Sequence, residues 1–127
     1  MVKVTPDIKR NKVIISFEGT VDLVQARDFY EDFKNALLKL KKGFVVLTDL
    51  SSLEKMNTET HHYIEKAMDL CNKQGVSKII RIIPDSTKDI GFHIMSLFHY
   101  SPDVKILTFK SLEQAGHYLA QNKDFSK

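Results

Sequence analysis

The 127-residue sequence is poor in the residue types that mark secreted, fibrous or membrane-spanning proteins. It has one cysteine, no tryptophan, three prolines and five glycines. The single cysteine, Cys71, cannot form an internal disulfide, which fits a reducing compartment. No apolar run approaches the roughly 20 residues of a membrane-spanning helix. The first seven residues, Met-Val-Lys-Val-Thr-Pro-Asp, lack the apolar core of a secretory signal. We therefore expect a cytoplasmic protein without a membrane span.

The chain also lacks the spacing patterns of common catalytic and metal sites. It has no glycine-rich phosphate loop and no Gly-x-Ser-x-Gly elbow. Cys71 lies at helical spacing with apolar residues, which is typical of a core position. His61 and His62 are adjacent and point about 100° apart on a helix, and His93 and His99 do not share a helical face. We expect no enzymatic activity, no metal and no cofactor.

The charged residues are scattered along the chain. The net charge of +3 comes from 19 basic and 16 acidic residues. The densest basic stretch, Lys39, Lys41 and Lys42, comes at the end of a predicted helix just before Gly43, where cations complement the helix dipole. Basic and aromatic residues are not interleaved there as they are in RNA-binding segments. We therefore expect no nucleic-acid partner.

The first third of the chain predicts a hairpin followed by a helix. A short strand over residues 2–7, a polar turn at 9–11 and an alternating apolar strand around 13–17 indicate an antiparallel pair. Asp22 is a suitable helix N-cap, and Gln25 three residues later completes a capping box. Apolar residues then follow at helical spacing as far as Leu40, and Gly43 is expected to end the helix.

The rest of the chain alternates strands and helices. A nearly continuous apolar run over 44–49 is typical of an interior parallel strand. A helix begins near Asn57-Thr58 and should end at Gly75. The remaining predicted elements are a strand over 78–83, a helix over about 87–100, a strand over 104–109, and a helix that Ser111 and Gln114 cap. This order predicts a single α/β domain over residues 1–127 with a mixed, largely parallel sheet of about five strands and about four helices.

Three motifs resemble those of one known family. Asp49-Leu50-Ser51 ends a strand, and an apolar residue then precedes Asn57-Thr58 at a helix start. Residues 17–22 (Phe-Glu-Gly-Thr-Val-Asp) are similar to the family's Gly-x-Leu-Asp stretch, and residues 109–115 to its closing Ser-Leu-Glu-x-Ala. With the element order, these motifs make nearly the whole chain resemble the STAS domains of bacterial anti-sigma-factor antagonists.

The resemblance implies a non-enzymatic interaction module in bacterial signalling or sigma-factor regulation, with an anti-sigma factor or a kinase as its protein partner. The family's modified residue corresponds to Thr58, which makes Thr58 a candidate phosphoacceptor. Asn57, Glu59 and Thr60 stand where the family has Asp, a small hydroxyl residue and Gly. A carboxylate at Glu59 would repel a phosphate on Thr58. A second interpretation is therefore that Asn57 or Thr58 serves only as a helix cap.

The candidate partner interface comprises the strand end and the helix start together. Its members are Asp49, Ser51, Ser52, Asn57, Thr58, Glu59, His61 and His62. In open α/β sheets, functional residues usually lie beyond the carboxyl ends of the strands, which is where this segment falls.

The predicted helix over 87–100 has apolar residues on more than one side. Phe92, Met95 and Tyr100 lie outside its core stripe and add apolar surface. The rest of the fold, a second copy in a homodimer, or an apolar ligand would each cover them. An apolar small-molecule or lipid-binding domain is therefore the alternative function.

Overall fold

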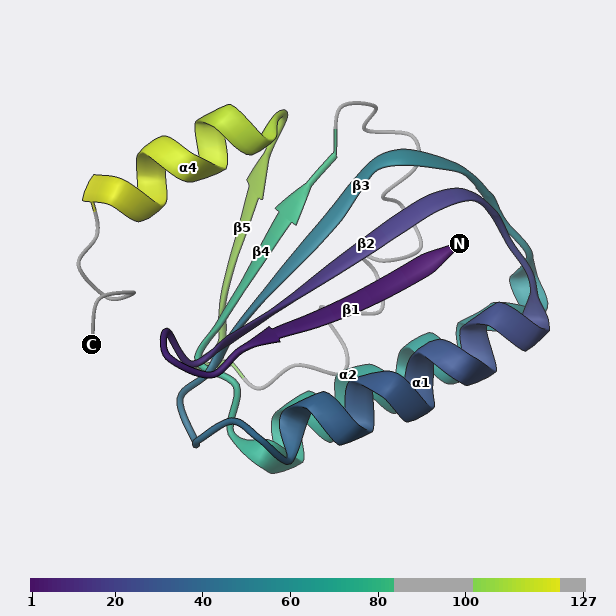
Figure 1. The fold of residues 1–127 in the computed structure, drawn as a ribbon, viewed down its shortest axis with the longest axis horizontal. Coiled ribbons are helices and arrows are strands. Elements are labelled where there is room, and N and C mark those ends of the chain that lie inside the picture. Colours follow the sequence, from purple (N-terminus) through teal and green to yellow (C-terminus); the bar gives the residue numbers. More distant parts are fainter. Residues whose placement is uncertain (84–101, 122–127) are drawn as a thin grey trace.

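The computed structural model describes residues 1–83 and 102–121, which form a five-stranded sheet with helices on both faces (Figure 1). The elements are β1 (Val2–Asp7), β2 (Lys12–Val21), α1 (Leu23–Leu37), β3 (Val45–Met56), the 3-10 turn η1 (Thr58–Thr60), α2 (His61–Gln74), β4 (Lys78–Ile82), β5 (Lys105–Phe109) and α4 (Leu112–Gln121). The predicted helix over 87–100 lies outside the described residues.

The strands lie in the order in which they occur in the sequence. β1 pairs antiparallel with β2, and the pairs β2–β3, β3–β4 and β4–β5 are all parallel. The predicted mixed sheet with an N-terminal antiparallel hairpin is thus confirmed. Because α1 connects the parallel pair β2–β3 and α2 connects the parallel pair β3–β4, both helices begin at the carboxyl end of the strands.

The sheet separates two apolar clusters. Phe17 and Val46 belong to the larger one, which packs against α1 and α2 and includes Phe33. Leu47, next to Val46 in the chain, points to the other face and belongs to a smaller cluster with Ala115 of α4. β3 and β4 supply apolar side chains to both clusters, which explains the apolar runs at 44–47 and 79–83 in the sequence. Cys71 is buried in the larger cluster, as predicted.

The ends of α1 and α2 follow from local chemistry. The Gln25 N–H donates to Asp22 Oδ1 at 2.9 Å and the Asp22 N–H donates to Gln25 Oε1 at 3.3 Å, so the predicted capping box is present. Gly75 ends α2 with φ of +86°, also as predicted. α1 ends at Leu37, before the predicted Gly43, because the next residues tighten into turns, in which the Leu40 N–H bonds Leu37 O at 3.1 Å.

β3 is longer than the sequence predicted. The sequence predicts a strand over 44–49 followed by a loop. The observed β3 has 12 residues in all, ends at Met56 and stays paired with β2. Two register shifts in the β2–β3 pairing, each with one extra residue in β3, accompany a bend, and Figure 1 shows β2 and β3 curling together toward the start of α1. Leu50 and Leu53 are buried along this extension and belong to the larger apolar cluster, so the core continues beneath the curled part of β3. Their burial is the physical reason for the longer strand.

Within residues 1–83 and 102–121, every helix is too short or too polar to cross a bilayer.

Candidate functional site

The predicted helix start lies at a corner of the molecule where β2 and β3 end. The Asn57 N–H donates to Val21 O at 3.3 Å, which ties the β3–η1 junction to the β2–α1 junction. Two of the three sequence motifs, one ending at Asp22 and one at Thr58, therefore meet in space. We call residues 21–24 and 57–62 together the corner; Figure 1 shows α1 and α2 beginning there.

Thr58 is presented to solvent by a buried neighbour. Thr58 and Glu59 are exposed, whereas Thr60 is completely buried. The Thr60 hydroxyl donates to Asn57 O at 2.6 Å, and the Thr60 N–H donates to the same oxygen at 3.0 Å. These two bonds fix one turn of 3-10 helix, with Thr58 at its first position. The first N–H groups of a helix have no intrahelical partner, so this position combines an accessible hydroxyl with a locally positive backbone.

The cap interpretation is wrong for the Asn57 side chain. Asn57 precedes η1 and Thr60 precedes α2, and neither makes a side-chain cap hydrogen bond. Asn57 contributes its backbone carbonyl instead, which Thr60 uses twice. The 3-10 turn delays the α-helix to His61, so Thr58 lies inside a turn and is not the residue that precedes either helix.

The other predicted interface residues are spread along β3 and into α2. Asp49 Oδ1 accepts the Ser51 N–H at 2.9 Å, and Ser51 and Ser52 are exposed on the strand extension. A strand rises about 3.3 Å per residue, so these residues are separated from Thr58 by most of the curled strand. His61 and His62 follow η1 directly, with His62 exposed and its ring edge-on to Tyr63. The structure thus joins the two histidines to Thr58 and does not bring Ser51 to them.

Two apolar residues at the corner were missed by the sequence analysis. Leu23 and Val24, the first residues of α1, are 42% and 53% exposed. They adjoin Val21, whose carbonyl binds Asn57. Their exposure had a signal in the sequence, because they fall outside the helical stripe that Ala26, Phe29, Phe33, Ala36 and Leu37 bury.

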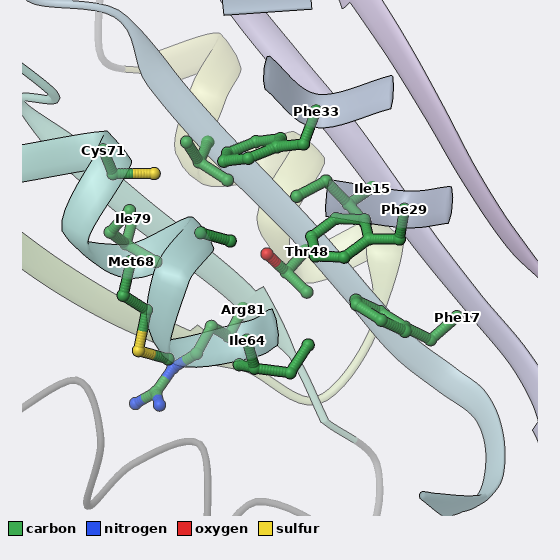
Figure 2. Close-up of a pocket in the computed structure, with 12 residues that line it drawn as sticks. Ile15, Phe17, Phe29, Phe33, Thr48, Ile64, Met68, Cys71, Ile79 and Arg81 are labelled. Atoms are coloured by element: carbon green, nitrogen blue, oxygen red, sulfur yellow. The ribbon is translucent and has the colours of Figure 1, made fainter. Parts of the chain in front are cut away.

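A small apolar cavity lies between the sheet and the helices α1 and α2. Figure 2 shows Phe17, Phe29 and Met68 around it, with Thr48 and Arg81 as polar members. The cavity has a volume of about 40 Å³, whereas ligand pockets typically measure about 300–1,000 Å³. The described part of the chain therefore does not favour the apolar-ligand alternative. The predicted pocket or dimer residues Phe92, Met95 and Tyr100 lie outside the described residues.

No group of three or more His, Cys, Asp or Glu side chains in ranges 1–83 and 102–121 is arranged to hold a metal ion.

Comparison with known proteins gives one family and several similar folds. The family model of the STAS domain matches residues 1–115. The Bacillus cell fate determinant SpoIIAA in its phosphorylated form aligns with a TM-score of 0.63 and 16% identity, over 94% of this chain and 99% of that one. The anti-sigma factor antagonist SpoIIAA in its unphosphorylated form aligns with a TM-score of 0.62 and 14% identity, over 96% and 99%.

A third similar structure is an uncharacterised Shewanella loihica protein of the DUF3478 family with a SpoIIAA-like fold. Its TM-score is 0.68 at 12% identity, over 94% of this chain and 92% of that one. No curated protein matches the sequence significantly. At these identities, the structural likeness shows the fold.

Proposed function

The chain belongs to the STAS domain family, and on this premise we propose that it is a non-enzymatic protein-interaction module of bacterial signalling in the cytoplasm. Its partner, an anti-sigma factor or a kinase of the same pathway, binds the corner. The observation that carries this proposal is the exposure of Thr58 on a turn anchored by the fully buried Thr60. Both the phosphorylated and the unphosphorylated SpoIIAA structures share the fold.

The corner has the composition of a small protein-binding surface. Leu23 and Val24 supply exposed apolar area, and the exposed polar residues Thr58, Glu59 and His62 belong to the same corner. Protein interfaces commonly have an apolar centre with a polar rim. Binding at this corner would bury the two aliphatic side chains. Removing their apolar surface from water would contribute favourably to the free energy of binding.

We further propose that phosphorylation of Thr58 weakens this binding. A phosphate adds about −1.5 to −2 charges at neutral pH. It would stand beside the Glu59 carboxylate and near the exposed Asp22 at the start of α1. The added charge must be desolvated when a partner covers Leu23 and Val24, so modification disfavours the complex.

Affinity capture with matched variants tests the proposal. Wild-type protein, Thr58→Glu and Thr5→Glu would each be immobilised and exposed to lysate of the producing organism. Thr5 is an exposed threonine on β1, outside the corner, and gives the same change of charge. We expect one protein partner to be retained by wild type and Thr5→Glu, and retention to fall at least about tenfold with Thr58→Glu, which corresponds to roughly 1.4 kcal/mol.

The phosphorylation step has its own measurement. Intact mass after co-expression with candidate protein kinases should show one added phosphoryl group, which Thr58→Ala removes. A protein that binds its partner but is never modified would contradict the switch and leave the interaction module intact. Equal retention by all three immobilised proteins would contradict the corner as the binding site.

A further inference from the structure

The end of the sheet opposite the corner is assembled from three connections. They are the β1–β2 turn (residues 8–11), the α1–β3 connection (38–44) and the α2–β4 connection (75–77). Figure 1 shows all three at the lower left, where the parallel strands begin. With the adjoining Lys73 in the last turn of α2, we call them the basic end.

Hydrogen bonds join these connections into one surface. The Asn11 amide donates to Lys41 O at 3.1 Å, and its oxygen accepts the Lys41 N–H at 2.8 Å. The Gly43 N–H donates to Gly75 O at 2.7 Å, and the Ser77 hydroxyl donates to Gly43 O at 2.6 Å. Segments that are distant in the sequence are therefore held in fixed relative positions.

This assembly gathers cations that the sequence leaves apart. The basic end carries Lys9, Arg10, Lys39, Lys41, Lys42 and Lys73, all exposed. One adjoining carboxylate is Asp7, at the end of β1. The Arg10 N–H donates to it at 3.1 Å and holds the pKa of Asp7 below its usual value, and the Arg10 guanidinium adds a second bond at 3.3 Å. Asp7 therefore offsets Arg10, and the five lysines supply the excess positive charge.

Among the residues that the structure describes, the two most exposed large apolar side chains belong to these connections. Ile8 is 61% exposed and Leu38 is 74% exposed. One exposed aliphatic residue on a protein surface is ordinary, but here both stand in connections that also carry lysines. The three connections have a single aromatic residue, Phe44, and it is buried. They therefore expose no ring on which a nucleic-acid base could stack.

We propose that the basic end is a peripheral binding surface for membranes that contain anionic lipids. The lysines bind the headgroups, and Ile8 and Leu38 enter the interfacial layer. This composition favours a bilayer over nucleic acid because exposed aliphatic side chains lie among the cations, and aliphatic side chains can enter a bilayer but cannot stack on bases. Membrane-bound protein would present Thr58, at the other end of the strands, to the solution. This proposal does not depend on the partner proposed for the corner.

Vesicle co-sedimentation tests it with the full chain. The vesicles are phosphatidylcholine alone and phosphatidylcholine mixed with phosphatidylglycerol. We expect binding to the mixed vesicles only, and its loss as ionic strength rises from about 0.1 to about 1 M, where the Debye length falls from about 10 to about 3 Å. Each surface cation contributes roughly fivefold to partitioning, so Lys41→Glu combined with Lys42→Glu should weaken binding about thirtyfold or more.

A matched double variant controls for net charge. Lys55→Glu combined with Lys110→Glu makes the same change at exposed lysines near the carboxyl ends of β3 and β5, and it should weaken binding to the mixed vesicles much less. Leu38→Asn should also reduce binding without a change of charge. Equal binding to neutral vesicles, no binding to mixed vesicles, or equal loss in both double variants would overturn the proposal. So would retention of duplex DNA or single-stranded RNA under conditions in which vesicles are not bound.

Discussion

The two ends of the sheet connect strands to helices in different ways. At the basic end, short connections hydrogen-bond to one another. The side-chain amide of Asn11 binds the Lys41 backbone through both its nitrogen and its oxygen. At the corner, the strands themselves extend: β2 and β3 curl as a pair until they reach the start of α1 and η1. Leu50 and Leu53 bury apolar surface along the curl. One end is therefore fixed by polar contacts between connections, and the other by core packing beneath a long strand.

At both ends the exposed side chains are held in place by other groups, and these groups differ between the two ends. At the basic end, the bonded connections point charged and aliphatic side chains outward with the backbone already satisfied. At the corner, Thr58 keeps its place because the adjacent Thr60 and the preceding β3 residues are buried. Replacing hydrogen-bonding side chains should therefore destabilise the basic end most. Truncating buried apolar side chains should destabilise the corner most.

The largest effect is expected from Leu53→Ala in the β3 extension. Leu53 is buried in the larger core cluster, and removing its side chain should lower the free energy of unfolding by about 2–5 kcal/mol through lost burial and a residual cavity. Urea unfolding followed by circular dichroism measures the change. Glu54→Ala, at the exposed next residue, should stay within about 0.5 kcal/mol. If both variants were equally mild, core packing would not hold the curl.

Local signals in the sequence predicted the fold well. The capping box at Asp22 and the left-handed Gly75 act within a few residues, and they correctly predicted the start of α1 and the end of α2. The apolar run before Asp49 predicted the start of β3 to within one residue. Interior parallel strands are covered on both faces, so their composition alone identifies them. These features were sufficient to predict a mixed sheet with an antiparallel hairpin.

The longer reach of β3 could not be predicted in the same way. Ser51 and Ser52 are small, polar and adjacent, a composition typical of loops. They remain in a strand because the pairing of β3 with β2 continues past them, from Asp49 opposite Ser16 to Ser52 opposite Glu18 and on to Met56. Motif order located Thr58, but the 3-10 turn depends on the burial of Thr60, which no local pattern reveals. The sequence showed Lys39, Lys41 and Lys42 as one basic stretch, but it did not show that the β1–β2 turn and the end of α2 bring further cations to the same end of the sheet.

A second prediction concerns the polar contacts of the basic end. Asn11→Ala removes two hydrogen bonds to Lys41 and puts alanine, which tolerates the left-handed region less well than asparagine, at φ of +53°. We expect a loss of about 2–3 kcal/mol in the free energy of unfolding, from the lost bonds and the left-handed backbone. Asn11→Gly tolerates this φ and should recover about 1 kcal/mol, minus the entropy that glycine adds to the unfolded chain. Thermal unfolding of the three proteins separates the two causes, and an unchanged Asn11→Ala would show that the bonds do not stabilise this end.

The smallest effect distinguishes the two helix starts at the corner. Asp22 caps α1 through a complete capping box, so Asp22→Ala should lower the free energy of unfolding by about 1 kcal/mol. The Asn57 side chain caps nothing, and its backbone carbonyl, which Thr60 binds, is kept in Asn57→Ala. That variant should change stability by less than about 0.5 kcal/mol. Urea unfolding of the pair measures both values. If Asn57→Ala lowered the free energy of unfolding as much as Asp22→Ala does, the Asn57 side chain would have to be a helix cap after all. A neutral Asn57→Ala makes this residue a usable probe of partner binding, because any loss of affinity could not then be attributed to unfolding of the corner.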